Sequence, residues 1–214
     1  MKYITDINKL DITKKYTYAD YLTWQFQERI ELIMGKIFRM SPAPSEIHQK
    51  VSFNITRAII PYTNENPCNI YYAPFDVRLI RQDSVDEKEI ISVVQPDIVI
   101  ICDESKIDDK GCLGAPDILF EILSKSTRKK DLHEKYTLYE SSGVREYWII
   151  DPIAETVQIN ASGNDRKYIP GKLLTKGDVA ESMILTGLTI DLDEVFPSIV
   201  EEPEEPYGPE VERI

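Results

Sequence analysis

Cysteine and histidine are scarce in this sequence, and their positions exclude several kinds of site. The three cysteines, Cys68, Cys102 and Cys112, form no C-x-x-C pair, which excludes the zinc sites built from such pairs. This sparse, odd-numbered set favours reduced structural thiols in a cytoplasmic protein. The two histidines, His48 and His133, accompany no G-x-S-x-G motif. Thiolate chemistry and a histidine-activated serine are therefore not indicated.

Long apolar runs and nucleotide-binding glycine loops are missing as well. No run of about 18 apolar residues occurs, so we expect no transmembrane helix. The first six residues, MKYITD, lack the apolar stretch of a secretory signal. Neither G-x-x-x-x-G-K-[ST] nor G-x-G-x-x-G is present, which argues against a P-loop and a dinucleotide-binding fold. These absences predict a cytoplasmic, globular protein with no membrane partner.

Basic residues are outnumbered, 25 against 37 acidic residues, which gives a net charge of −12. Such a protein has no general attraction to phosphate backbones. Residues 201–214 hold six glutamates and one arginine, so they carry −5 of this charge. We expect this Pro- and Glu-rich tail to be disordered and to contribute little to folding. One dense basic patch, at positions 125 and 128–130, is either a solvated face or a phosphate-binding surface.

The N-terminal part of the chain predicts a helix–hairpin–helix arm. Residues 17–20, TYAD, resemble a capping box and should start a helix that runs to about Gln27. The Met34-Gly35 pair between two apolar runs predicts a hairpin turn. Ser45 should cap a second helix, which Pro61 is expected to end.

The remainder predicts an α/β domain, with a mixed sheet flanked by helices, over residues 1–200. A helix should begin at Ser126 or Thr127, continue to about Ser142 and stop at Gly143. Two apolar strands flank it, so the strand–helix–strand unit predicts a right-handed parallel crossover. The predicted strands cover residues 70–80, 93–102, 118–123 and 146–151, residues 104–115 should be a loop, and two or three short strands should follow to about residue 185.

Two carboxylates lie where the strand pattern calls for apolar side chains. Asp97 follows Pro96 and opens one apolar strand, and Glu121 lies inside the next. Burying a carboxylate among apolar residues is costly unless a cation or a charged partner offsets the cost. Two such carboxylates on neighbouring strands could converge on one divalent ion, and their hard oxygen atoms suit Mg²⁺ or Mn²⁺.

Lys135 is a third residue in an unexpected position. In the predicted helix, Leu132, Tyr136 and Tyr139 form the inward stripe, and Lys135 lies beside it. A lysine there can reach toward Glu121 at the end of the preceding strand. Three interpretations stay open: a catalytic lysine, a structural ion pair with Glu121, or a side chain that extends along the sheet to solvent.

These residues belong to a segment that closely resembles the Uma-two family of restriction endonucleases, part of the PD-(D/E)XK nuclease superfamily. The resemblance covers about residues 16–196. It rests on ELIMGK at 31–36, MSP at 40–42 with His48 soon after, QPDIV at 95–99, PDILFEILS at 116–124, STRKKDLHEKY at 126–136 and GVREYWIIDP at 143–152.

The resemblance implies a restriction-endonuclease-like fold and a metal-dependent phosphodiesterase core that acts on DNA. Asp97 matches the first acidic position of the superfamily and Glu121 the second, so both would bind Mg²⁺ or Mn²⁺. The superfamily lysine should stand two residues after the second acid, where this chain has Leu123. In this family the lysine is taken to come from the following helix, which points to Lys135. Glu31 matches a family glutamate and would add a metal or water-positioning ligand.

We therefore expect a Mg²⁺-dependent DNA endonuclease. The catalytic candidates are Glu31, Asp97, Glu121 and Lys135, and the substrate-binding candidates are His48, Lys125, Arg128, Lys129 and Lys130. One alternative is a nuclease-fold module that no longer cuts and binds DNA or a protein partner. Another is a hydrolase of a small phosphorylated substrate. The sequence leaves open whether the chain forms a homo-oligomer.

Overall fold

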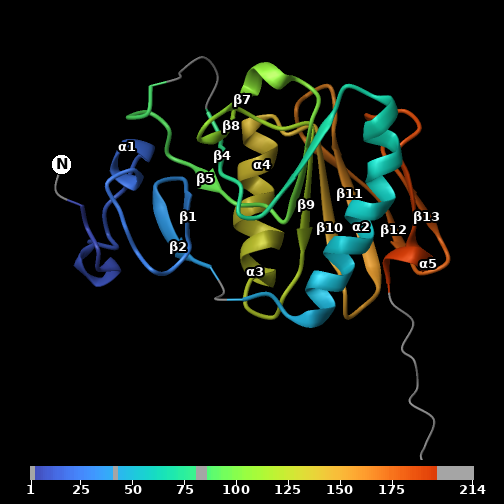
Figure 1. Ribbon diagram of the computed structural model, residues 1–214, viewed down its shortest axis with the longest axis horizontal. Helices are drawn as coiled ribbons and strands as arrows, with labels where there is room; N and C mark the ends of the chain where they lie inside the picture. The colour runs from blue at the N-terminus through green and yellow to red at the C-terminus, as the bar shows by residue number, and fades with distance from the viewer. Residues whose placement is uncertain (1–2, 41–42, 81–85, 197–214) are drawn as a thin grey trace, which may run out of the picture.

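The computed structural model describes residues 3–40, 43–80 and 86–196 of the chain. They form two six-stranded sheets, with one helix packed between the sheets and another on the outer face of the second sheet (Figure 1). In this part of the chain no helix is both long and apolar enough to cross a membrane. The predicted tail, residues 201–214, lies outside the described residues, so its disorder and the domain boundary at residue 200 stay predictions.

The fold is mixed α/β, as the sequence predicts. The first sheet has the order β2-β1-β5-β4-β8-β7, the second has the order β12-β11-β10-β9-β6-β3, and β13 pairs with β14 in a separate ribbon. The strands of the first sheet are β1 (Ile30–Ile33), β2 (Lys36–Arg39), β4 (Val77–Arg78), β5 (Val93–Val94), β7 (Ile107–Asp108) and β8 (Gly111–Leu113). The others are β3 (Asn69–Tyr72), β6 (Ile98–Ile101), β9 (Ile118–Ile122), β10 (Glu146–Asp151), β11 (Thr156–Ser162), β12 (Tyr168–Thr175), β13 (Val179–Glu181) and β14 (Thr189–Asp191).

The helices occupy distinct layers. The helices and helical turns are η1 (Ile7–Lys9), α1 (Tyr18–Tyr21), α2 (Glu46–Glu65), η2 (Glu104–Lys106), α3 (Arg128–Lys130), η3 (Asp131–Lys135), α4 (Tyr136–Ser142) and α5 (Leu192–Val195). Segments α3, η3 and α4 form one continuous helix between the sheets, which we call the central helix. Gly143 ends it with a φ of 82°, as predicted. Strands β9 and β10, which precede and follow this helix in the chain, pair in parallel, as predicted.

Alternation along β9 decides which side chains face the central helix. Phe120 and Ile122 pack into the core beneath α2, while Leu119 and Leu123 pack into the core beneath the central helix. Glu121 has the same parity as Leu119 and therefore faces the central helix. The antiparallel register pairs Ile98 with Phe120, so Asp97, one residue before β6, falls opposite Glu121 on the same face. The fold thus brings both carboxylates to one end of one sheet face.

The central helix contains a π-helical turn, and this turn changes which residues point inward. The residues of this turn, η3, follow a wider helical turn than the rest of the helix. An extra residue in a turn shifts the phase of everything before it by about 100°. The predicted inward position of Leu132 is therefore wrong: Leu132 is 37% exposed, and Asp131 is buried in its place. Lys135 is buried and faces inward, so the interpretation in which it extends to solvent is wrong.

Two of the predicted strands are each divided between the two sheets. Residues 70–80 form β3 and β4, and residues 93–102 form β5 and β6. Each break contains a proline, Pro74 or Pro96, which offers no N–H to a strand ladder. The predicted loop at 104–115 is also wrong in part, because it contains the short hairpin of β7 and β8.

The N-terminal helix–hairpin–helix arm is not confirmed. The capping box at Thr17 and the hairpin at Met34-Gly35 are present, but α1 ends at Tyr21 rather than near Gln27. The hairpin pairs with β5 and so belongs to the first sheet rather than to a separate arm. Pro61 lies inside α2 and does not end it. Its position is exposed, so water can bond the carbonyl oxygen that the missing N–H leaves unpaired.

The prediction of three reduced cysteines is wrong. Cys68 and Cys102 form a disulfide, and Cys112 is a buried free thiol. Strands β3 and β6 pair Asn69 with Ile101, which places Cys68 opposite Cys102, with their Cα atoms 3.9 Å apart. The two cysteines are 34 residues apart in the chain, so only the strand pairing reveals their proximity.

Candidate active site

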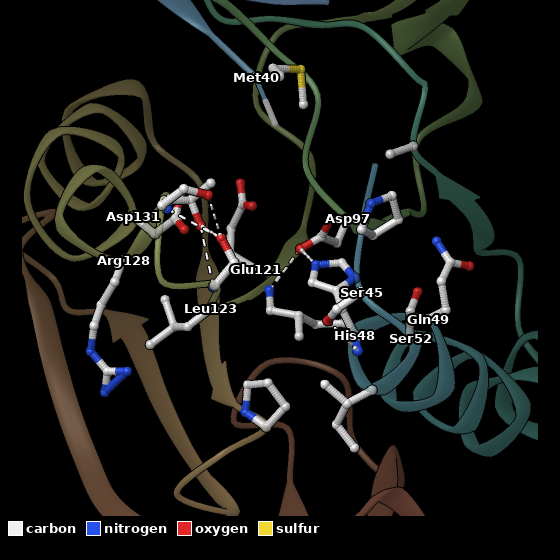
Figure 2. Close-up of a pocket in the computed structure, with 18 of the residues that line it drawn as sticks. Met40, Ser45, His48, Gln49, Ser52, Asp97, Glu121, Leu123, Arg128 and Asp131 are labelled. Carbon is white, nitrogen blue, oxygen red and sulfur yellow. Dashed lines mark hydrogen bonds and ion pairs between the residues drawn. The ribbon is translucent and has the colours of Figure 1, made fainter. Parts of the chain in front are cut away.

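A cleft of about 1060 Å³ opens where the N-terminal turns of α2 approach the start of the central helix. Asp97 and Glu121 line it, and His48 and Asp131 approach from the two helices (Figure 2). Lys135 lies behind Glu121 and is 2% exposed. The cleft floor is therefore lined by ionisable side chains from one sheet and two helices.

Lys135 joins carboxylates from both sheets. Its Nζ atom lies 2.7 Å from Glu121 Oε1 on β9 and 2.9 Å from Glu31 Oε1 on β1. Asp131 Oδ1, one turn earlier in the central helix, lies 3.7 Å from the same ammonium. The ion pair between Lys135 and Glu121, one of the interpretations drawn from the sequence, is therefore present. It belongs to a larger buried network that ties the two sheets together through the central helix.

Glu31 is fully buried at the far side of this network. Its Oε2 accepts a hydrogen bond of 2.5 Å from Lys130, and its Oε1 accepts one of 3.1 Å from the backbone N–H of Gln95. Burial raises the pKa of Glu31, but Lys135 and Lys130 outweigh it and lower the pKa below the usual range. Glu31 is thus ionised and held by two ammonium groups. Its shell is filled by protein donors, unlike that of an open metal ligand.

Asp97 is held by a backbone amide and by His48. Its Oδ2 accepts a hydrogen bond of 2.7 Å from the backbone N–H of Ile122, and His48 Nε2 lies 3.3 Å from the same oxygen. Burial lowers the pKa of His48, but the hydrogen bond and charge of Asp97 outweigh it and raise the pKa above the usual value. His48 therefore binds Asp97 as a cation over a wider pH range than an ordinary histidine.

The Glu121 carboxyl group has a strongly altered acidity. Its burial raises its pKa to about 8, since the opposing charge of Lys135 is offset by the nearby charges of Asp131, Asp97 and Glu31. The pKa of Asp131 is raised too, chiefly by burial. Four carboxyl groups thus share two lysine ammonium groups and His48. A centre with this excess of negative charge is one that an added cation would stabilise.

These residues fit a small hard cation such as Mg²⁺. In the described part of the chain, the contacts to Glu121 are made at Oε1 and those to Asp97 at Oδ2, so each carboxylate has a second oxygen directed elsewhere. No group of three or more His, Cys, Asp or Glu side chains among the described residues is arranged to hold a metal ion. Two carboxylates suffice for Mg²⁺, which usually keeps several waters and binds substrate phosphates as well.

The basic candidates separate into two sets. Lys130 is drawn inward to Glu31 and is only 11% exposed, so it serves the buried network. Lys125, Arg128 and Lys129 are exposed, and Arg128 forms an ion pair with Asp151. Lys125 and Arg128 line the cleft. The predicted patch is thus partly a wall of the cleft and partly a structural contact.

Two residues of this centre were absent from the sequence-based candidates. The Tyr139 hydroxyl donates a hydrogen bond of 2.6 Å to Glu121 Oε1, and Asp131 lies beside Lys135. The inward position of Tyr139 is visible in the helical pattern, but its bond to Glu121 is not. Asp131 is four residues before Lys135, a spacing that signals an ion pair. The π-helical turn that buries Asp131 has no such signal.

Comparison with known proteins agrees with this geometry. A crystal structure of "a putative nuclease belonging to DUF820" from Anabaena variabilis ATCC 29413 has a TM-score of 0.63 to this chain, with 18% identity over 85% of this chain and 97% of the other. At that identity the likeness establishes the fold alone. A comparison with curated proteins finds no match. The chain matches the Uma2 family, described as "Putative restriction endonuclease", over residues 18–193. The protein therefore belongs to the Uma2 family, and this membership supports a nuclease.

Proposed function

We propose that this protein is a Mg²⁺- or Mn²⁺-dependent DNA endonuclease that hydrolyses phosphodiester bonds. The observation that carries the proposal is the placement of Asp97 and Glu121 opposite each other on one sheet face, at the floor of a cleft, with Lys135 bound to Glu121. Membership of the Uma2 family supports the same activity.

Asp97 and Glu121 would hold the ion, which when bound lowers the pKa of a water molecule and neutralises charge on the phosphate. His48 and the Ile122 amide fix the orientation of Asp97, while Lys135 and Tyr139 fix that of Glu121. These bonds leave the reacting groups little freedom to reorganise, which lowers the barrier to the chemical step.

Lys135 would act by charge rather than as a base. Its burial lowers its pKa, but the carboxylates of Glu121, Glu31 and Asp131 raise that pKa well above the usual value. The ammonium therefore stays protonated at neutral pH and cannot take a proton from water. In this proposal Lys135 orients Glu121 and stabilises negative charge that develops on the phosphate.

Cleavage of plasmid and oligonucleotide DNA in Mg²⁺ and in Mn²⁺ tests the proposal. Wild type should cut, chelation of the metal should stop it, and Glu121→Ala and Asp97→Asn should each lose more than about a hundredfold in rate, since even changes outside the ligand shell cost 10–100-fold. The matched control is Glu146→Gln, which neutralises a buried glutamate on the adjacent strand away from the cleft. Cleavage by Glu121→Ala at the wild-type rate would refute the proposed site.

A module that no longer cuts is the second candidate, and one observation favours it. Lys135 and Glu31 are fully enclosed in ion pairs, as expected of a network that only stabilises the fold. In that case metal ions should neither promote cleavage nor bind at Asp97, and titration of wild type with Mn²⁺ separates the two candidates.

We also propose a cytoplasmic location, since DNA is the proposed substrate. That reducing compartment would act against the Cys68–Cys102 disulfide that the structure contains. The pairing of β3 with β6 does not depend on the bond, because four further residue pairs hold the two strands together.

A further inference from the structure

Two aromatic rings stand exposed on one wall of the cleft. Phe53 on α2 is 66% exposed, and Tyr72 at the end of β3 is 65% exposed. Both line the same cleft as Asp97 and Glu121. Neither ring stacks on another aromatic side chain among the described residues, although other rings of the chain do so repeatedly. These two rings are therefore available to a ligand.

The position of Phe53 follows from the two faces of α2. Val51, Ile55 and Ile59 form the face that packs on the second sheet. Phe53 and Ile60 lie off this face, at the spacing of two helical turns, and border the cleft. Edge strand β3 runs beside α2 and carries Tyr72 to the same side. The wall is thus built from two rigid elements rather than from a loop.

The opposite wall of the cleft is basic. Lys125 and Arg128 are exposed and line the cleft around the start of the central helix, where Arg128 also forms an ion pair with Asp151. Figure 2 shows Arg128 on one side of Glu121 and Asp97, and the α2 residues Gln49 and Ser52 on the other. A ligand lying across the carboxylates would therefore meet cations on one side and aromatic rings on the other.

We propose that the cleft takes a single-stranded segment of DNA, with phosphates toward Lys125 and Arg128 and bases stacked on Phe53 and Tyr72. This inference rests on the proposed endonuclease function and names its substrate class. A single strand presents charged phosphates on one side and exposed base faces on the other. The phosphates suit the wall with basic side chains, and the base faces suit the wall with aromatic rings. In a duplex the base faces are covered by their neighbours and cannot stack on protein rings.

The charge of the chain supports the same choice. Duplex binding draws most of its affinity from many phosphate contacts. Here the net charge is −12, and the cleft cations Arg128, Lys130 and Lys135 are already paired with carboxylates. Base stacking supplies affinity that does not depend on such charges. An apolar protein surface is a poor occupant, because it would cover the polar carboxyl groups of Asp97 and Glu121 without offering them partners.

Binding without cleavage tests the inference. Fluorescence anisotropy in Ca²⁺, with no Mg²⁺ or Mn²⁺, compares a labelled oligothymidine of about 20 nucleotides with a duplex of equal length. Wild type should prefer the single strand. Phe53→Ala and Tyr72→Ala should each weaken single-strand binding by between about fivefold and a hundredfold, with duplex binding unchanged.

Matched variants separate stacking from simple apolar contact. Phe53→Leu keeps apolar area but has no aromatic face, so it should weaken binding nearly as much as Phe53→Ala. Tyr72→Phe should bind as wild type does. Ile169→Ala removes an apolar side chain that is 59% exposed on β12, outside the cleft lining, and should change nothing.

Several results would overturn the inference: Phe53→Leu binding like wild type, equal binding of duplex and single strand, or no binding of either. The test stays distinct from that of the endonuclease proposal. Ring-dependent binding of single strands without cleavage in Mg²⁺ or Mn²⁺ would refute the nuclease activity alone. Cleavage of duplex DNA that is indifferent to both rings would refute the substrate class alone.

Discussion

Two buried glutamates on adjacent parallel strands, Glu121 on β9 and Glu146 on β10, are held in opposite ways. Glu146 accepts hydrogen bonds from neutral donors: the Trp148 indole, the Ser182 hydroxyl and the backbone N–H of Met183. Glu121 instead lies among charges, with Lys135 against it and three further carboxyl groups nearby.

Burial raises the pKa of both glutamates, so burial alone does not distinguish them. What differs is the unsatisfied charge and the access to a cleft. Glu146 is satisfied within the fold, whereas Glu121 keeps excess negative charge around it at a cleft floor. The comparison teaches that a carboxylate in a strand marks a functional site only when its surroundings leave it short of positive charge.

The strongest way to break this comparison is to remove the cation beside Glu121. Lys135→Met should abolish cleavage and destabilise the fold by roughly 3–5 kcal/mol, because it leaves buried carboxylates without their partner. Chemical denaturation and cleavage assays on the same preparation measure both effects. Lys125→Met, which removes an exposed lysine from the cleft wall, is the control and should leave stability within about 0.5 kcal/mol. Unchanged stability in Lys135→Met would show that the network is not buried as described.

The pH dependence of metal binding should sharpen the comparison between Glu121 and Glu146. Since the pKa of Glu121 is about 8, the carboxyl group must release a proton before it binds a cation. The affinity for Mn²⁺ should therefore rise about tenfold per pH unit from 6 to 8 and then level off. Calorimetry in buffers of different ionisation enthalpy would detect the released proton. An affinity that is flat from pH 6 to 8 would contradict the raised pKa of Glu121.

The same raised pKa predicts the stability of the metal-free protein. The folded state holds the Glu121 proton up to about pH 8, whereas an ordinary glutamate loses it near 4.5. The stabilisation is thus present at low pH and is lost as pH rises through this window. As the pH rises from about 4.5 to 8, the melting temperature of wild type should decrease, and that of Glu121→Gln should decrease less. An identical fall in both proteins would assign the effect to other groups.

Neutralising Glu146 should lower the stability of the fold and leave the cleavage rate unchanged. Glu146→Gln replaces an acceptor of several hydrogen bonds by an amide, which should cost about 1–3 kcal/mol. Cleavage per folded molecule should equal that of wild type, because the side chain lies outside the cleft lining. A loss of activity beyond the loss of folded protein would remove the distinction between the two glutamates.

The smallest expected effect concerns the Tyr139 hydroxyl. Tyr139→Phe deletes one of two donors to Glu121 Oε1 while Lys135 remains. We expect a cost of about 1 kcal/mol in stability and a few-fold slower cleavage. The pH profile of metal binding should also move upward, because the hydroxyl stabilises the ionised carboxylate. An unmoved profile would limit Tyr139 to a packing role.

Local signals in the sequence predict much of the fold. The hairpin at Met34-Gly35, the cap at Ser45 and the stop at Gly143 follow from backbone preferences that act within a few residues. Strand pairing between distant segments has no local signal, so neither the disulfide nor the division of two strands between sheets could be predicted.

The sequence predicts which residues belong to the candidate site better than it predicts how they contact one another. Asp97, Glu121 and Lys135 stand out because charged side chains are unusual in apolar strands and on inward helix faces. The bond of Lys130 to Glu31 joins residues 99 positions apart, and the burial of Asp131 depends on a helix distortion. Both arise from packing of the central helix between two sheets, which no short segment encodes.

The bridging position of Lys135 has a consequence for the newly made chain. One sheet contributes Glu31 and the other contributes Glu121, and only the helix between them brings the two groups to one ammonium. A chain still on the ribosome, or one whose two halves have not yet docked, has all the proposed catalytic residues but no assembled centre. The proposed activity would then appear only once the central helix has joined the two sheets.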